Sequence, residues 1–244
     1  MEYEDEEDEI LAEREYDATI AECNETLRLD PDDSVAYVQR GAAWSRKGEY
    51  DKAIADYSQA ICLDPNDSVA YGGRGWNYAK KGECDKAIAD FNEAIRLDPQ
   101  DATAYCHRGY AWAEQGEYDK AIADFTEVIR LDSENAFAYC SRGYAWGKRG
   151  KYDRAIADCS EAIRIDPNHT DAYGRRGFNW QQKGEYDKAI ADFTEAIRLA
   201  PQDAIAYGRR GFSWHRKKQY DEAITDYTEA IRLNPQEASS FYNR

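Results

Sequence analysis

Aromatic, small and charged residues recur along the chain in a pattern with a period of 34 residues. In the copy at 102–135, Tyr105, Gly109 and Trp112 are separated by four and then three residues. This spacing places all three on one face of a helix. Gly116 follows, where a left-handed conformation can end that helix, and a second apolar run with helical spacing comes next. Each copy therefore predicts two helices joined by a tight turn.

Near-copies of this unit follow one another without insertions through most of the 244 residues. Such a period is typical of a solenoid, in which each unit buries its apolar face against its neighbours. We expect six full repeats, at 34–67, 68–101, 102–135, 136–169, 170–203 and 204–237. Residues 1–33 should hold an acidic segment and a degenerate repeat, with Tyr3–Arg14 as its first helix and the second helix within 16–33. Residues 238–244 begin a truncated seventh repeat or a capping helix.

Glycine occupies the eighth position of every full repeat, inside the predicted first helix. Glycine in a helix costs about 1 kcal/mol relative to alanine, so its recurrence indicates that another backbone passes close to this position. The residues concerned are Gly41, Gly75, Gly109, Gly143, Gly177 and Gly211.

The repeat resembles the tetratricopeptide repeat (TPR) family, whose pattern combines a large aromatic residue, glycine, tyrosine, alanine, phenylalanine and a closing proline. The resemblance covers about 85% of the chain. The chain departs from the pattern in having arginine instead of leucine at position 7, Ser133 instead of proline in the third repeat, and Lys218 instead of glycine in the sixth. The resemblance implies an all-α, right-handed superhelix of antiparallel helix pairs with a concave groove, which acts as a binding scaffold.

The formal net charge of −16 argues against DNA or RNA as a partner. No apolar run approaches the length of a membrane span, and no basic-then-apolar leader is visible, so we expect a cytoplasmic protein that does not bind membranes. Residues 1–15 contain nine acidic groups. They are expected to form either a solvated cap or a tail that docks on a basic partner or in the chain's own groove.

The six cysteines fall on repeat positions that suggest no pairing, so we interpret them as reduced, small hydrophobic residues. The alternative is a metal or redox site built from Cys106, Cys140 and His107, for which no fourth ligand can be named. The three histidines have no obvious nucleophile beside them, and the carboxylates recur with the repeat, whereas a catalytic pair would be singular. We therefore expect no enzyme activity, no cofactor and no metal.

Position 7 is arginine and position 23 is aspartate in every full repeat. Each lies on the flank of its predicted helix, about 60° from the apolar stripe, so we interpret the two as structural partners that tie the two helices or adjacent repeats together. A ladder of ligand-binding arginines is the alternative. The residues are Arg40, Arg74, Arg108, Arg142, Arg176 and Arg210, with Asp56, Asp90, Asp124, Asp158, Asp192 and Asp226.

Position 9 carries an aromatic residue in five repeats, on the stripe of the first helix that lines the groove in TPR proteins. Exposed apolar surface of this kind marks interfaces. Position 5 is small nearby, arginine appears at position 6 in the last two repeats, and the last repeat adds an arginine at position 13. The alternative is that the aromatic rings pack on the next repeat and the arginines are solvated. The predicted ligand-binding residues are Trp76, Tyr110, Tyr144, Arg175, Phe178, Arg209, Phe212 and Arg216.

The sequence thus predicts a protein–protein interaction scaffold or adaptor. Its groove should take an extended peptide with acidic or carboxylate groups, which arginine can bind through two parallel hydrogen bonds. One competing function is a structural array in which copies stack end to end through the uncapped last repeat, giving a homo-oligomer. The other is a regulatory TPR module of a larger protein.

Overall fold

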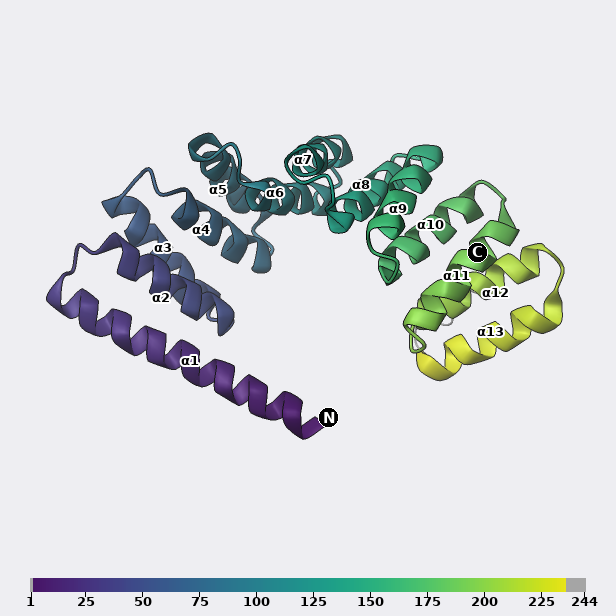
Figure 1. Cartoon of the computed structure of the whole chain (residues 1–244), viewed down its shortest axis with the longest axis horizontal. Coiled ribbons are helices and arrows are strands. Elements are labelled where there is room, and N and C mark those ends of the chain that lie inside the picture. The colour runs from purple at the N-terminus through teal and green to yellow at the C-terminus, as the bar shows by residue number, and fades with distance from the viewer. Residues whose placement is uncertain (1, 236–244) are drawn as a thin grey trace. The chain divides into compact units, whose positions relative to one another are not determined.

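The computed structural model describes residues 2–235, with side chains from residue 13 onward. That part of the chain contains thirteen α-helices and no strand (Figure 1). The expected seventh repeat at 238–244 lies outside the described residues. The helices are α1 (Glu2–Leu29), α2 (Ser34–Arg46), α3 (Tyr50–Leu63), α4 (Ser68–Lys80), α5 (Cys84–Leu97), α6 (Ala102–Glu114), α7 (Tyr118–Leu131), α8 (Ala136–Lys148), α9 (Tyr152–Ile165), α10 (Thr170–Gln182), α11 (Tyr186–Leu199), α12 (Ala204–Arg216) and α13 (Tyr220–Leu233).

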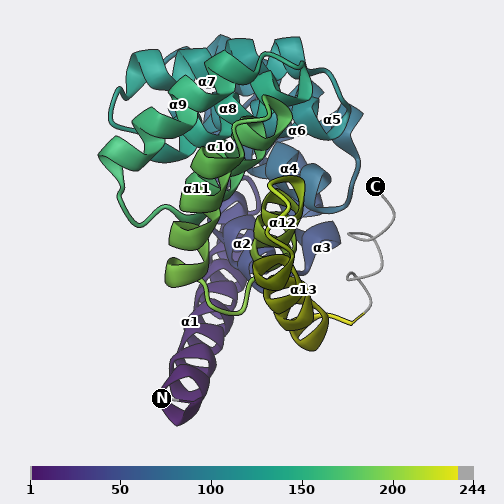
Figure 2. The same ribbon diagram turned by 90° about the vertical axis from the view of Figure 1, so that its right-hand side faces the viewer.

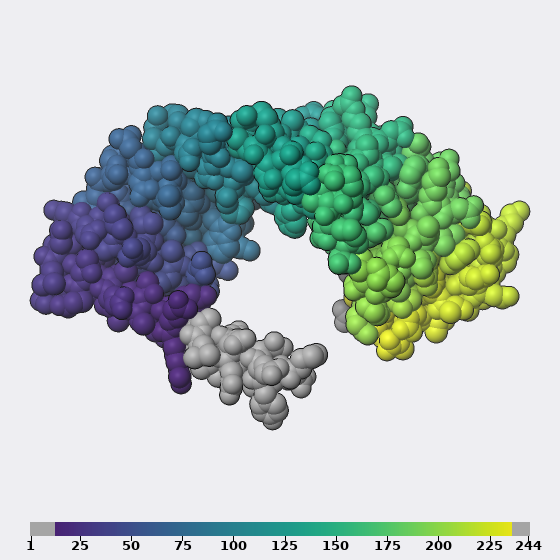
Figure 3. Space-filling view, viewed as in Figure 1, coloured from purple at the N-terminus to yellow at the C-terminus, as the bar shows by residue number. Residues whose placement is uncertain are grey.

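The chain divides into two compact units, Met1–Lys120 and Ala121–Arg244. Consecutive helices pack against one another from α1 to α6 in unit 1 and from α8 to α13 in unit 2 (Figure 3). The helices of unit 1 are coloured purple to teal, and those of unit 2 teal to yellow. The expected repeat boundaries stay a prediction, but every helix pair from α2 onward follows the period of 34 residues.

The ends of the helices are set by short-range chemistry. The Asp67 side chain accepts hydrogen bonds from the backbone N–H groups of Val69 and Ala70, at 2.9 and 3.0 Å, and so caps the start of α4. The glycines that follow the first helices have φ between 68° and 79°, which confirms the predicted left-handed ends. Lys218 takes this conformation in the sixth repeat, with φ of 63°, at a steric cost that glycine avoids.

The glycine at position 8 lies where the second helix of the same repeat crosses. A Cβ atom on Gly75 would stand 3.2 Å from the backbone oxygen of Ala87 and 3.0 Å from the Phe91 ring. A Cβ atom on Gly143 would stand 3.2 Å from the backbone oxygen of Ala155. The predicted close approach of a second backbone is therefore confirmed, and a side chain at this position would push the helix pair apart.

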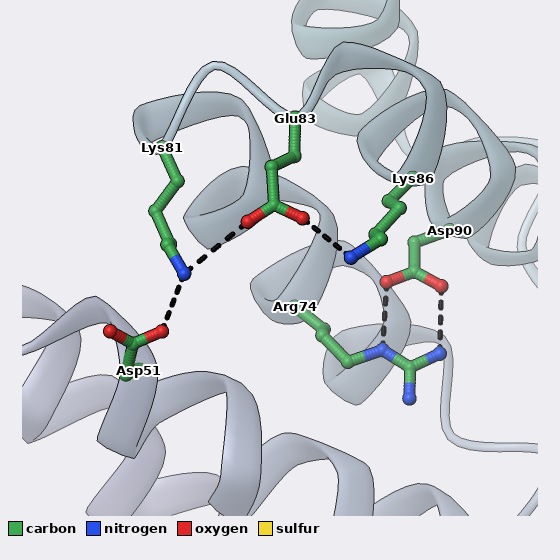
Figure 4. A network of polar contacts seen from close by, with 6 residues as sticks. All are labelled: Asp51, Arg74, Lys81, Glu83, Lys86 and Asp90. Carbon is green, nitrogen blue, oxygen red and sulfur yellow. Dashed lines mark hydrogen bonds and ion pairs between the residues drawn. The ribbon is translucent and has the colours of Figure 1, made fainter.

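The arginines at position 7 bind the aspartates at position 23, which confirms their predicted role between the helices. Arg74 on α4 donates from Nε and Nη2 to the two carboxylate oxygens of Asp90 on α5, each at 2.8 Å (Figure 4). Its third nitrogen donates to Ser58 Oγ of the preceding repeat, at 3.2 Å. The same arrangement joins Arg40 to Asp56, Arg142 to Asp158, Arg176 to Asp192, and Arg210 to Asp226.

A second, exposed set of ion pairs links adjacent repeats at the turns. Lys81 Nζ lies 2.5 Å from Asp51 Oδ1 of the preceding repeat and 3.3 Å from Glu83, which in turn pairs with Lys86 (Figure 4). The Asp51 side chain is 84% exposed, whereas that of Asp90 is 9% exposed. Solvent therefore screens the Lys81–Asp51 pair far more than the Arg74–Asp90 pair.

The N-terminal segment corrects one expectation, because no separate helix forms over Tyr3–Arg14. Helix α1 runs unbroken from Glu2 to Leu29, and its first half extends beyond α2 (Figures 1 and 2). Arg14 stands where the full repeats carry the glycine that ends their first helix, so nothing in the sequence stops the helix there. The second half of α1 packs on α2 and buries Ile20, Cys23 and Leu27.

All six cysteines have free thiols, and Cys23, Cys140 and Cys159 are buried. Burial raises the pKa of both Cys106 and Cys140 to about 11, so these thiols stay protonated. Among the residues whose positions are described, no group of three His, Cys, Asp or Glu side chains is placed to hold a metal ion. None of the described helices is long and apolar enough to cross a membrane.

Candidate functional site

Four of the predicted ligand-binding residues line one cavity in unit 2. This cavity, which we call the arginine pocket, has a volume of about 210 Å³. Trp76 lines a different cavity in unit 1, while Tyr110, Phe212 and Arg216 line neither of the two. The arginine pocket is formed by Tyr144, Gly147, Lys148, Gly174, Arg175, Phe178, Asn179 and Arg209.

Each arginine of the pocket lies over an aromatic ring from the preceding repeat. The Cζ atom of Arg175 is 4.4 Å from the centre of the Tyr144 ring, and that of Arg209 is 4.5 Å from the centre of the Phe178 ring. These distances are within the range of cation–π attraction. The rings are half-buried and therefore pack on the next repeat, as the alternative interpretation expected, but the arginines that cover them are half-buried as well.

Arg175 and Arg209 form no ion pair with any residue that the structure describes. Arg46 and Arg154 also lack a carboxylate partner among those residues, but both are exposed to solvent. Burial pulls the pKa of Arg209 below its ordinary value, an effect that Asp203 partly offsets. Arginine nevertheless stays charged at neutral pH. A half-buried charge without a partner is costly, so the pocket favours the entry of an anion.

Two buried polar atoms in the wall of the pocket have no hydrogen-bond partner, the Nε atom of Arg175 and the Oδ1 atom of Asn179. The Nδ2 atom of Asn179 donates to the backbone oxygen of Arg175, at 2.7 Å. In unit 1 the corresponding Asn77 also accepts a hydrogen bond from Ser45 of the preceding repeat, at 3.0 Å. Gly147 takes the place of that serine in unit 2, so Asn179 loses its donor.

Two glycines explain why the arginine pocket is open. A Cβ atom on Gly174 would meet nothing within 4 Å, so the absence of a side chain leaves space there. A Cβ atom on Gly147 would stand 2.8 Å from Asn179 Oδ1, so this glycine allows the close approach of the asparagine. The sequence showed both glycines, but their consequence depends on which positions of adjacent repeats face each other.

Of the cavity in unit 1, the sequence pointed to Trp76 and to the small residue at position 5, which is Gly72, but not to the other residues that line it. It has a volume of about 420 Å³ and is lined by Tyr57, Gly72, Gly73, Trp76, Phe91 and His107, among others. We call it the aromatic pocket. The consecutive glycines at positions 72 and 73 were the available signal, because they leave two adjacent helical positions without side chains.

Two models of the tetratricopeptide repeat match the sequence, one at residues 34–67 and 136–169, the other at 73–136 and 181–238. The chain belongs to the tetratricopeptide repeat family. No curated protein matches it. The predicted all-α TPR fold is therefore confirmed, and TPR proteins typically act as non-enzymatic scaffolds for protein–protein interaction.

Solved structures of other TPR proteins have the same fold. The crystal structure of MamA is 26% identical in sequence, with a TM-score of 0.63, and the match covers 70% of this chain and 94% of MamA. YrrB, described as a TPR protein with an unusual peptide-binding site, is 22% identical with a TM-score of 0.67, covering 80% and 97% of the two chains. PilF of Pseudomonas aeruginosa is 19% identical with a TM-score of 0.73, covering 86% and 96%.

Proposed function

We propose that this TPR chain is a protein-interaction scaffold whose arginine pocket binds an acidic segment of a partner protein. The observation that carries the proposal is the pair of half-buried arginines, Arg175 and Arg209, which have no carboxylate partner among the described residues. A glutamate or aspartate side chain would supply the missing negative charge and accept charge-assisted hydrogen bonds. The peptide-binding site described for YrrB supports the proposal by likeness of fold.

The rest of the pocket suits a side chain that is part of a peptide. Phe178 and Tyr144 offer aromatic surface beside the arginines, and Lys148 lies 5.3 Å from the centre of the Tyr144 ring, where it adds a third cation. The net charge of −16 disfavours nucleic acid, which carries similar anionic groups at high density. A short acidic segment with neighbouring apolar residues fits the combination of cations and rings.

The experiment is a peptide-display selection against the chain, followed by fluorescence anisotropy with the selected peptide. We expect the peptide to contain glutamate or aspartate, and we expect the double variant Arg175→Gln/Arg209→Gln to bind it at least about 10-fold more weakly, because each lost charge-assisted hydrogen bond contributes about 1.5–3 kcal/mol. The matched control is Arg46→Gln/Arg154→Gln, which removes two exposed arginines and should leave the affinity unchanged.

A second variant tests the pocket without altering its charge. Gly174→Leu should fill the space beside Arg175 and abolish binding, whereas the corresponding Gly72→Leu in unit 1 should not affect it. Selection of peptides without acidic residues, or equal affinity for the wild type and both arginine-pocket variants, would show that the pocket is not the binding site.

We infer a competing function, self-association, from the outer face of α13. Ile224 and Ile231 are 63% and 40% exposed, whereas the corresponding Ile190 and Ile197 on α11 are each 8% exposed. Exposed apolar surface of this kind marks contacts between proteins. If it joins copies of the chain, the mass measured by light scattering will rise with concentration and will return to that of a monomer in Ile224→Glu. A constant monomeric mass would rule this function out.

A further inference from the structure

The aromatic pocket of unit 1 differs in chemistry from the arginine pocket. Its walls are the rings of Tyr57, Trp76, Phe91 and His107. Trp76 is held from the side by Tyr50, with ring centres 6.0 Å apart in an edge-to-face arrangement. The cavity of about 420 Å³ lies within the range of sites that bind small molecules or side chains.

The consecutive glycines 72 and 73 make this pocket in two different ways. A Cβ atom on Gly72 would meet nothing within 4 Å, so this position opens onto free space. A Cβ atom on Gly73 would lie 2.4 Å from Cζ and 2.8 Å from the hydroxyl oxygen of Tyr57. The Tyr57 ring therefore extends from α3 into the place that a side chain at position 73 would occupy. The later repeats carry His107, Ser141, Arg175 and Arg209 at this position.

The hydroxyl group of Tyr57 has no hydrogen-bond partner among the described residues. The side chain is only 5% exposed, and burial raises the pKa of Tyr57 to about 12, so the hydroxyl stays protonated at neutral pH. Phe91 and Phe193, which occupy the corresponding position of other repeats, pack without a hydroxyl. The hydroxyl oxygen is not among the buried atoms that lack a partner, so water in the pocket can reach it. A ligand with a polar atom at this point would replace that water and form a direct hydrogen bond with the hydroxyl.

The charged residues around the pocket already have other contacts. Asp101 caps the start of α6 by accepting hydrogen bonds from Thr103 and Ala104, at 2.9 and 3.1 Å. Arg46 is exposed and lies over the Tyr16 ring, at 5.9 Å from its centre. Burial lowers the pKa of His107, so its imidazole is neutral at pH 7. The interior of the pocket therefore favours an uncharged ligand.

We propose that the aromatic pocket is a second binding site, which takes an uncharged aromatic side chain with a hydrogen-bonding tip, of the tyrosine type, from a protein partner. The aromatic ring would lie against Trp76 and above Gly72, and its hydroxyl would pair with that of Tyr57. This site shares no residue with the arginine pocket, so it goes beyond the proposed binding of an acidic segment and can fail or succeed independently of it.

The experiment is an NMR titration with N-acetyl-tyrosinamide and N-acetyl-phenylalaninamide as probes. The indole N–H signal of Trp76 reports on the aromatic pocket, and that of Trp180 in unit 2 serves as the internal control. We expect N-acetyl-tyrosinamide to shift the Trp76 signal with a dissociation constant of about 1 mM, as is typical for a ligand of this size. The phenylalanine probe should bind about 5-fold more weakly, because it lacks the hydrogen bond to Tyr57.

Three variants separate the contribution of the open space at Gly72 from that of the Tyr57 hydroxyl. Gly72→Leu should fill the pocket and abolish the shift, whereas Gly174→Leu, its counterpart in unit 2, should leave the shift unchanged. Tyr57→Phe should weaken binding of the tyrosine probe about 5-fold and leave the phenylalanine probe unaffected. The proposal is wrong if the Gly72→Leu variant still binds N-acetyl-tyrosinamide, or if the indole signal of Trp180 shifts instead of that of Trp76. It is also wrong if the wild type binds the two probes with equal affinity.

Discussion

At the scale of single residues, the fold depends on which glycines are in contact and which are not. The contacts of Gly75 and Gly143 follow from the period of the sequence, because position 8 faces the second helix in the first, second, fourth, fifth and sixth repeats. The contacts of Gly72, Gly73 and Gly147 do not. The space at Gly72 was anticipated from its small size beside Trp76, whereas the contacts of Gly73 and Gly147 depend on neighbouring repeats whose residues differ and were not predicted.

Substitution of the neighbouring glycines 72 and 73 by alanine should have opposite effects. The methyl group added by Gly72→Ala has no atom within 4 Å, so this substitution should stabilise α4 by about 0.5–1 kcal/mol through the higher helix propensity of alanine. Gly73→Ala collides with the buried Tyr57 ring and should destabilise unit 1 by about 1–3 kcal/mol. Urea unfolding followed by circular dichroism measures both, and equal effects would contradict the placement of Tyr57.

The histidine in the aromatic pocket predicts a dependence of stability on pH. Burial against Phe91 lowers the pKa of His107. The charge of Lys80 lowers this pKa further, and the charge of Asp101 partly offsets the decrease. The unfolded chain therefore binds a proton near pH 6.5 that the folded chain accepts only at lower pH. The free energy of unfolding should fall as the pH drops from about 6.5 toward the folded pKa, and His107 should cause no change at about pH 7.5 and above.

The control for this prediction is His107→Phe, which cannot titrate. The difference in unfolding free energy between the wild type and the variant should change between about pH 6.5 and the folded pKa and stay constant at about pH 7.5 and above. Effects of the other titrating groups cancel in this difference. A difference that does not change with pH would mean that His107 has the same pKa in both states.

At the scale of helices, the arginine–aspartate pairs hold the two helices of a repeat together in the first, second, fourth, fifth and sixth repeats, and the same arginines connect these repeats to the helix before. Their role was predictable because both residues recur at fixed positions on the flanks of the two helices. The course of α1 was predicted wrongly, since the periodic phase continued through Arg14 although the glycine that ends a helix was missing. Lys218 shows that a turn can form without this glycine, so the helix pair around it contributes to the turn as well.

The ion pairs of Asp90 and Asp51 are drawn in Figure 4, and the Asp90 side chain is buried whereas that of Asp51 is exposed. Asp90→Ala leaves the guanidinium of Arg74 without its two acceptors and should lower the free energy of unfolding by about 3 kcal/mol. Asp51→Ala removes a partner of Lys81 from a largely exposed site and should cost less than about 0.5 kcal/mol. Similar losses in the two variants, measured by urea unfolding, would show that burial does not decide the strength of these pairs.

At the scale of the whole molecule, the negative charge and the arginine pocket act in opposite directions on an acidic ligand. The net charge of −16 repels such a ligand at long range, while Arg175 and Arg209 attract it at contact. Composition predicted the first effect. The second could only be located in the structure, because the missing partners of the two arginines are a property of their surroundings.

Salt should therefore speed the association of an acidic peptide with this chain. Raising the ionic strength from about 20 mM to about 150 mM shortens the Debye length from about 20 Å to 8 Å and screens the long-range repulsion. We expect the association rate constant in stopped-flow fluorescence to rise over this range, and an uncharged variant of the peptide to show no change. A rate constant that falls with salt would mean that positive charge around the pocket outweighs the net charge.

The contact between position 12 of one repeat and position 10 of the next has a consequence for how the chain folds. Ser45 bonds to Asn77, Gln181 bonds to Ser213, and Gly147 leaves room for Asn179. Because the repeats are similar in sequence, a repeat could pack against the wrong neighbour during folding. It could pack on the second repeat after it, or on a repeat of another chain. Such an error would place Gln181 against an asparagine, or leave Ser45 facing alanine. These contacts thus specify the successors of the first, fourth and fifth repeats, which limits misassembly at those three junctions.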